Sequence, residues 1–123
     1  MPFLRTPARG EIWFVQLHTD PPEKGRRPVV VISLDARNRN PHASTVLVVP
    51  LSTTPARAPS HVELPPGETG LSELSTARAE DISCVPKAWL VEPRSALRRL
   101  GENRLREIAA GVQLALGFPS VGY

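Results

Sequence analysis

Two arginines, a pair of hydroxyl residues and a carboxylate are the side chains of this sequence that could act on an anionic substrate. Arg27 begins an apolar run, Ser52 and Thr53 follow another, and Arg78 precedes Glu80 by two positions. A planar guanidinium binds two oxygens of a phosphate at once, and a hydroxyl can donate a further hydrogen bond. These residue types favour chemistry at a phosphate group.

Pro28 indicates how a charged residue could be held at the start of a buried strand. Residues 29–32 are apolar and β-branched, which is typical of a strand buried on both faces. Proline fixes its own φ and pushes the preceding residue into an extended conformation. Arg27 should therefore leave the strand end in a defined direction. The alternative is an exposed arginine that only flanks a strand.

The composition predicts a single domain over residues 1–123, with loose ends at 1–8 and 118–123. The 14 prolines favour short strands joined by stiff turns. The net charge is +3, and all basic residues except Lys24 and Lys87 are arginine. Either a GC-rich genome or binding to phosphate would produce this bias. A nucleic-acid or acidic-peptide partner is compatible with the charge.

Several classes of protein are disfavoured. The single Cys84 cannot form an internal disulfide, so we expect a reduced, cytoplasmic setting. Cys84 itself is expected to be a small residue of the core. His18, His42 and His61 lack the short spacings of a metal site, so we expect no metal and no cofactor. The sequence contains neither an apolar run of the ~20 residues that a membrane span needs nor a signal-peptide pattern.

The elements that would position these residues are mostly strands. Apolar or alternating patterns predict strands at residues 9–17, 28–34, 45–51 and 60–64, with one or two more in 71–84. Trp13 is expected in the core.

Near the end of the chain, apolar residues recur with helical spacing, at Leu105, Ile108, Ala109, Val112 and Leu116. Asn103 is the expected N-cap and Gly117 the expected stop. Because helices do not alternate with strands, the order predicts a mainly β fold. We expect a small, mostly antiparallel barrel closed by a C-terminal helix.

Five blocks of the sequence, in order, carry a family resemblance: "RGEIWFVQL", "GRRPVVVIS", "VLVVPLST", "SHVEL" and "STARAEDIS". Together they resemble the MazF/PemK family of toxin endoribonucleases, from about residue 9 to 90, and the C-terminal helix also fits. The resemblance implies an SH3-like barrel, a homodimer, metal-independent cleavage of single-stranded RNA, and neutralisation by a cognate antitoxin with an acidic flexible tail.

The resemblance also implies roles for residues. Arg27 matches a catalytic arginine, and Ser52 stands where the family usually has threonine. Arg78 matches a catalytic arginine of the PemK-like branch, with Glu80 in place of an aspartate. Arg78 and Glu80, two residues apart on one expected strand, should point to the same face. Glu80 is the preferred proton acceptor, and the neighbouring Asp81 is expected to face the other way.

A second set of residues is expected to contact RNA: Lys24, Arg26, Thr53 and His61. The first two lie in residues 18–27, which match a family loop that contacts RNA and antitoxin. Some relatives carry a catalytic histidine in that loop, but here Pro21 stands in its place, so that role is not transferred to His18.

The expected activity is that of a sequence-specific mRNA interferase that inhibits translation and growth. The RNA 2′-hydroxyl attacks the adjacent phosphorus and leaves a 2′,3′-cyclic phosphate, or a 3′-phosphate after hydrolysis, and a 5′-hydroxyl. The alternative is a non-catalytic SH3-like toxin or binding module, either similar to gyrase poisons or limited to RNA binding.

Overall fold

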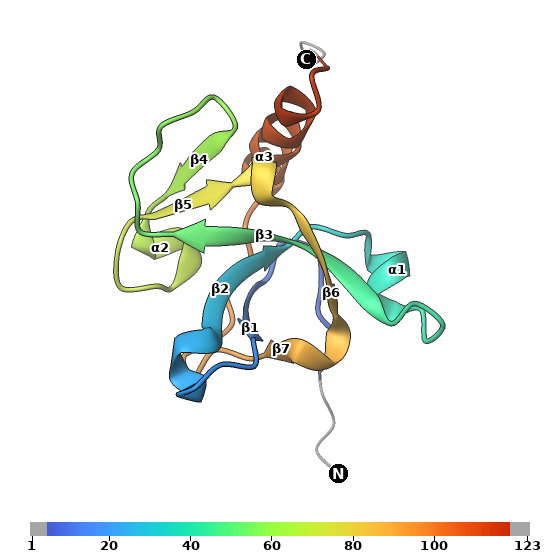
Figure 1. The fold of residues 1–123 in the computed structure, drawn as a ribbon. Helices are drawn as coiled ribbons and strands as arrows, with labels where there is room; N and C mark the ends of the chain where they lie inside the picture. Colours follow the sequence, from blue (N-terminus) through green and yellow to red (C-terminus); the bar gives the residue numbers. More distant parts are fainter. Residues whose placement is uncertain (1–4, 119–123) are drawn as a thin grey trace.

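The computed structural model describes residues 5–118, whose strands form a seven-stranded sheet with every pair antiparallel (Figure 1). The strand order is β4-β5-β3-β2-β1-β7, and β6 also pairs with β3. The strands are β1 (Ile12–Gln16), β2 (Arg26–Val31), β3 (Thr45–Ser52), β4 (His61–Leu64), β5 (Ser75–Arg78), β6 (Ser83–Pro86) and β7 (Leu90–Val91).

Short helices fill the connections, and one longer helix ends the described chain. The α-helices are α1 (Asp35–Arg39), α2 (Pro66–Thr69) and α3 (Glu102–Ala115). The 3₁₀-helices are η1 (Pro22–Gly25), η2 (Ala79–Asp81) and η3 (Lys87–Trp89). The predicted mainly β, mostly antiparallel fold with a C-terminal helix is therefore confirmed. Strand pairing does not close the sheet into a ring, because its path ends at β4 and β7.

Strand β2 is buried on both faces, as its valine run predicts. Val30 is fully buried in one apolar cluster, together with Ile12 and Val49. Val29 and Val31 belong to a second cluster on the other face, which also holds Trp13. Successive side chains of a strand point to opposite faces, so one strand supplies both cores. The sheet must curve to enclose both.

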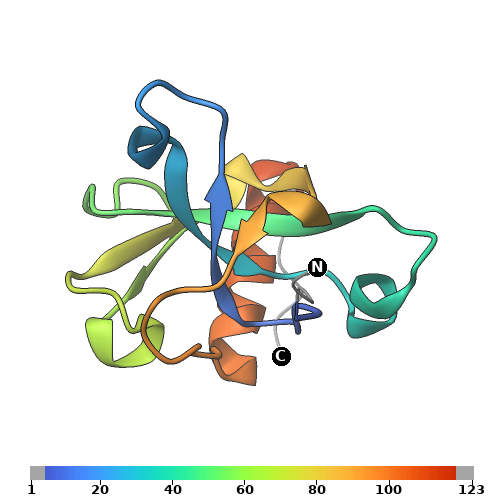
Figure 2. The same cartoon turned by 90° about the horizontal axis from the view of Figure 1, so that it is seen from below.

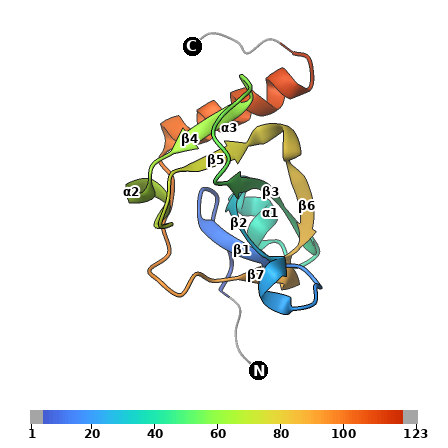
Figure 3. The same cartoon turned by 60° about the vertical axis from the view of Figure 1, so that its left-hand side comes forward.

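Helix α3 covers one end of this curved sheet, beside β4 and η2 (Figure 3). Leu105 and Ile108 are buried as predicted, whereas Ala109 and Leu116 of the predicted stripe are exposed. The expected N-cap at Asn103 is wrong, because the helix begins at Glu102 after Gly101.

The expected stop is confirmed, because Gly117 has a φ of +86°, in the left-handed region that glycine tolerates best.

The segment over residues 71–84 contains two strands separated by a turn. Arg78 ends β5 and Glu80 lies in η2, so these two residues do not share a strand as expected. Cys84 is exposed in β6, which corrects the expected core position. Strand β6 is short and pairs with β3 at the edge of the sheet. There, the alternation of residue types does not decide which face of the strand is covered.

At the N-terminal end, the segment of residues 5–8 contacts the buried Glu11. Arg5 and the backbone N–H of Ala8 both donate hydrogen bonds to the buried Glu11 carboxylate, at 3.1 and 2.6 Å. Residues 1–4 and 119–123 of the expected loose ends lie outside the described residues. The loop between β1 and β2, which contains η1, projects from the body of the molecule (Figure 2).

Gly111 allows α3 to approach the sheet closely, and replacing it should destabilise the fold. A Cβ at this position would lie 2.6 Å from the Ser60 carbonyl oxygen and 2.8 Å from the Ala79 Cβ. Gly111→Ala should lower the free energy of unfolding by about 1–3 kcal/mol, although alanine favours a helix. Urea denaturation followed by circular dichroism measures this change.

Gly67→Ala is the matched control, because a Cβ at Gly67 meets nothing within 4 Å. The control should change stability by less than about 1 kcal/mol. Equal effects of the two substitutions would contradict the proposed close packing of α3.

Candidate functional site

Arg27 lies exposed at the start of β2, where the strand leaves its partner β3. Strand β2 pairs with β1 from Arg26 onward but with β3 only from Val29, which lies opposite Pro50. Continuing that register by two residues puts Arg27 opposite Ser52, at the free ends of the two strands. Within residues 5–118 the Arg27 guanidinium has no ion pair and no hydrogen bond. Its charge is therefore available to a ligand.

The register of the next strands puts further site residues on the same face as Ser52. Ser52 pairs with Thr76 of β5, and Arg78, two residues later, pairs with His61 of β4. Directly paired residues and residues two apart share a face of a sheet. Ser52, Arg78 and His61 thus share one face, which continues across β3 toward Arg27.

The Ser52 hydroxyl is oriented by the chain that follows it. Its Oγ accepts a hydrogen bond of 3.0 Å from the backbone N–H of Thr54. With this lone pair engaged, the hydroxyl proton is free to donate outward. Serine lacks the β-branch that would restrict a threonine rotamer, and this hydrogen bond supplies the missing restraint.

Glu80 and His61 form a tightly bonded pair behind Arg78. The His61 Nδ1 accepts a hydrogen bond from the Arg57 backbone N–H at 3.0 Å, so Nε2 carries the proton and donates to Glu80 at 2.8 Å. Ser60 also donates to Glu80, at 2.9 Å. Both ring nitrogens of His61 are occupied, and its side chain is only 9% exposed.

These contacts set the acidity of Glu80. Burial would raise the pKa of its carboxyl, but hydrogen bonds from His61, from its own backbone N–H and from Ser60 outweigh burial. The pKa falls to about 2. A base works best when its pKa lies near the working pH, so Glu80 is a weak proton acceptor at neutral pH.

Arg78 lies beside two carboxylates without bonding well to either. Its Nε is 3.5 Å from a Glu80 oxygen and 3.2 Å from an Asp81 oxygen. Asp81 therefore faces Arg78, contrary to expectation, because η2 turns the chain after β5. This Nε is nevertheless buried and makes no hydrogen bond among the described residues.

The residues expected to contact RNA differ in their exposure. Lys24 in η1 and Thr53 after β3 are exposed, as expected of surface contacts. Arg26 is half-buried, because its guanidinium lies 5.3 Å from the centre of the Phe14 ring and donates to the Glu92 carbonyl oxygen at 3.4 Å. Only Lys24 and Thr53 present their side chains freely to solvent.

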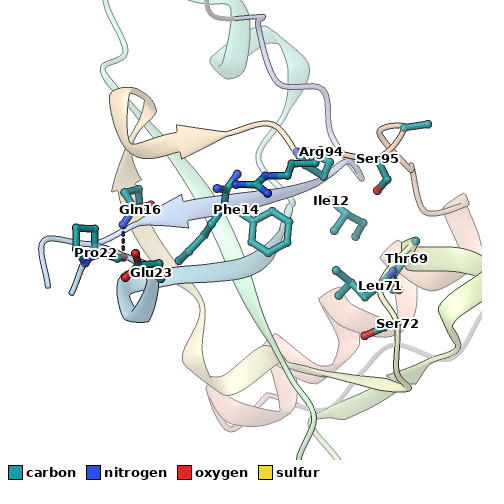
Figure 4. A pocket seen from close by; sticks show the side chains of 14 residues that line it. Ile12, Phe14, Gln16, Pro22, Glu23, Thr69, Leu71, Ser72, Arg94 and Ser95 are labelled. Carbon is teal, nitrogen blue, oxygen red and sulfur yellow. Dashed lines mark hydrogen bonds between the residues drawn. The ribbon is translucent and has the colours of Figure 1, made fainter. Parts of the chain in front are cut away.

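A cavity of about 690 Å³ opens at the same end of β2, on the opposite face of the sheet (Figure 4). Phe14, Ile12 and Leu71 line it with apolar surface, and Arg26 and Arg94 bring positive charge to it. Gln16 also contributes an amide, which donates to the Pro22 carbonyl oxygen at 2.8 Å. Glu23 also lines the cavity, so its rim carries two positive charges and one negative charge. An apolar floor with such a rim suits a flat group that also carries polar edges.

Two further classes of site were searched for in residues 5–118. No group of three or more His, Cys, Asp or Glu side chains lies together so as to hold a metal ion. None of the helices described in this part of the chain combines the length and apolar character needed to cross a membrane.

The sequence and the fold were compared with those of known proteins. Residues 8–116 match the family described as PemK-like, MazF-like toxin of type II toxin-antitoxin system. The chain belongs to this toxin family. It is 36% identical over 110 residues to the probable endoribonuclease MazF5 of Mycobacterium tuberculosis, covering 89% of this chain and 93% of that protein.

Other members of the toxin family extend the likeness. The endoribonuclease MazF of Staphylococcus saprophyticus is 26% identical over 117 residues, covering 92% of this chain and 93% of that protein. A mycobacterial endoribonuclease solved in complex with its cognate antitoxin superposes with a TM-score of 0.72 at 26% identity, covering 94% and 99% of the two chains. A MazE–MazF structure from Deinococcus radiodurans, at 20% identity, shares the fold with a TM-score of 0.69 over 93% and 98% of the chains.

Three contributors to the toxin's site were missed in the sequence. Thr54 orients Ser52, Arg57 anchors the ring of His61, and Ser60 bonds Glu80. All three lie in or beside the loop between β3 and β4, where no periodic pattern predicts which groups turn back onto the sheet. The proline and hydroxyl content of residues 52–60 predicts only a turn.

Glu80 should make the stability of the toxin pH-dependent. Its pKa in the folded protein, about 2, is below its ordinary value of 4.5. The ionised carboxylate therefore stabilises the fold above about pH 4.5, and that stability is lost as the pH falls toward 2. Because 29% of the side chain is exposed, we expect Glu80→Gln to cost on the order of 1–2 kcal/mol at pH 7.

Urea denaturation of both proteins at several pH values between 7 and 2.5 measures this effect. The stability difference between wild type and Glu80→Gln should shrink below about pH 4.5. A difference that stays constant down to pH 2.5 would mean that the carboxylate is not stabilised by its neighbours.

Proposed function

We propose that this toxin-family chain is a metal-independent endoribonuclease that cleaves single-stranded RNA. The observation that carries the proposal is the exposed, unpaired Arg27 guanidinium at the free end of β2, opposite the outward-donating Ser52 hydroxyl. The family and its named endoribonuclease members support this activity. The target is mRNA, and its cleavage inhibits translation and growth.

The proposed reaction uses the substrate's own nucleophile. The 2′-hydroxyl gives its proton to solvent water, its oxygen forms a bond to the adjacent phosphorus, and the bond from phosphorus to the 5′-oxygen breaks, with water returning a proton to that oxygen. The 5′-oxygen leaves as a hydroxyl. The other product carries a 2′,3′-cyclic phosphate, which water can open to a 3′-phosphate. DNA lacks the 2′-hydroxyl and should not be cleaved.

The protein's contribution to this reaction is charge in a fixed geometry. Arg27 neutralises the phosphate as its negative charge grows, and Ser52 donates a hydrogen bond to one of its oxygens. Arg78 lies on the same face and supplies a second guanidinium. The sequence favours Glu80 as the proton acceptor, but its low pKa and its bonds to His61 and Ser60 favour a positioning role. We therefore assign Glu80 to the support of His61 and Arg78.

RNA binding would extend from Arg27 around the end of β2 to the opposite face of the sheet. Lys24 and Thr53 are exposed at the two strand ends, and the cavity lined by Phe14 and Arg26 offers an apolar floor beside positive charge. A base of single-stranded RNA is flat and carries polar edges, so this cavity suits one. His61 contributes indirectly, by holding the loop between β3 and β4.

The proposed protein partners are an antitoxin and a second copy of this chain. An antitoxin with an acidic flexible tail would complement the positive charge of the chain and compete with RNA. A homodimer would cover apolar side chains that the described residues leave exposed, among them Leu114, Leu116 and Phe118 on and after α3. Cleavage of mRNA and the single Cys84 both favour the cytoplasm.

Arg27→Ala tests the proposed function. Losing a donor aimed at developing charge typically lowers a rate by about 100- to 1,000-fold, and we expect at least that loss in kcat. The Arg27 side chain is exposed and has no hydrogen-bond or ion-pair partner in residues 5–118, so the variant should fold normally. The measurement is cleavage of a long mixed-sequence RNA in EDTA, with end-mapping of the fragments and a matching DNA as the control substrate.

Near-normal cleavage by a folded Arg27→Ala protein would remove Arg27 from the mechanism. Failure of the wild-type protein to cleave varied RNAs would instead favour a binding module. Cleavage that stops in EDTA would contradict the proposed metal independence.

A further inference from the structure

A second, smaller cavity lies on the same face of the sheet as Ser52. It measures about 80 Å³ and is lined by Thr54, Pro55, Arg57, His61 and Arg78. This volume equals that of two to three water molecules, at about 30 Å³ each. A tetrahedral oxyanion is of this size, whereas a base or a sugar ring is larger. The cavity therefore selects for a small ligand.

The polar groups around this cavity are mostly hydrogen-bond donors without internal partners. In the described part of the chain, the Arg57 guanidinium makes no ion pair and no hydrogen bond, and neither does the Thr54 hydroxyl. The two terminal nitrogens of Arg78 are likewise free, since only its Nε approaches a carboxylate. Two guanidinium groups and a hydroxyl suit a phosphate group.

Arg78 supplies an independent observation at this cavity. Its Nε is buried and lacks a hydrogen bond, although Asp81 and Glu80 oxygens lie at 3.2 and 3.5 Å. Both Glu80 oxygens already accept from His61 and Ser60. Buried polar atoms without a partner are rare in folded proteins and call for an explanation. The carboxylates hold the Nε side of the guanidinium, and its two terminal nitrogens, which lie between the cavity and the face that carries Ser52, remain for an anion.

The loop that carries Arg57 is held in place without any ligand. The Arg57 backbone N–H donates to His61 at 3.0 Å, and the neighbouring Ala56 N–H donates to Glu63 at 3.5 Å. Upstream, the Thr54 N–H donates to Ser52 at 3.0 Å. The cavity is therefore preorganised, which reduces the entropy lost on binding.

We propose that this cavity binds a second phosphate of the RNA, next to the phosphate that is cleaved at Arg27 and Ser52. The inference rests on the proposed function. The hydrogen bond between Thr54 and Ser52 makes the two phosphate sites direct neighbours. The cavity phosphate holds the strand in register, so Arg57 and Thr54 contribute to binding and take no part in bond breaking.

Arg57→Ala is the decisive variant, because the side chain is exposed and its backbone bond to His61 is retained. Arg39→Ala is the matched control, since Arg39 is an exposed arginine in α1, on the opposite side of the molecule from β4 (Figures 1 and 2). The probe is an RNA that contains the mapped cleavage sequence with a 2′-deoxy nucleotide at the cut. Its affinity is measured between about 50 and 200 mM salt.

Losing one phosphate contact on a single strand should reduce the slope of log K against log salt by about 0.7. On cleavable RNA, KM should rise about tenfold while kcat stays within about twofold. Arg57→Lys should keep the slope but bind more weakly, because a lysine cannot grip two oxygens. The Arg39→Ala control should match the wild-type protein in all three measurements.

Two results would overturn the inference. The first is an unchanged salt slope in Arg57→Ala. The second is a kcat loss of about 100-fold at constant KM, which would place the cavity at the reacting phosphate. If the wild-type protein cleaves no RNA, the salt titration is made on the mixed-sequence RNA itself, and an Arg57-dependent slope there would contradict the proposed function alone. Cleavage with an unchanged slope would contradict only the second phosphate site.

Discussion

Burial of β2 on both faces is the constraint on which the rest of the structure depends. Its valines alternate between two apolar clusters, so each face of the strand must be covered by other parts of the chain. A sheet that encloses a core on each side has to curve strongly. A charged side chain can reach solvent only where the strand is no longer covered by other parts of the chain, which is at its start. Arg27 occupies that position, and Pro28 keeps the backbone extended behind it.

The strands were predictable because their signals are local. Alternation and β-branched runs located β1 to β4, and the apolar stripe located α3. The predictions that failed concern the burial of side chains, which depends on the residues that lie opposite them in space. Cys84 is exposed because β6 is short and lies at an edge, and Arg26 is half-buried because Phe14 lies beneath it. Periodicity shows that residues share a face and cannot show what covers that face.

The residues of the candidate site likewise fall into those with a local sequence signal and those without one. The placement of Arg27 and Ser52 was predictable because each stands at the end of an apolar run, and their proposed roles come from the family resemblance. Arg57 was not, because its importance comes from a loop that folds back over β4. That fold depends on bonds from backbone N–H groups to the side chains of His61 and Glu63. Such bonds have no sequence period, so only the structure reveals them.

The loop between β3 and β4 also bears on Ser52 and Glu80, the two positions at which the resemblance implies other residue types. Serine at position 52 lacks the β-branch of threonine, and the Thr54 N–H restores a fixed hydroxyl direction. Glutamate at position 80 has one methylene more than aspartate. Its carboxylate reaches both His61 and Ser60 across the interface between η2 and β4.

The bonds of Glu80 have a chemical consequence. A carboxylate that accepts two side-chain hydrogen bonds and titrates near pH 2 serves better as a support than as a base. Glu80 fixes His61, His61 fixes the backbone of Arg57, and Arg57 faces the small cavity beside Ser52. Under the proposed function, Glu80 thus acts through the placement of positive charge around the RNA backbone and not through proton transfer.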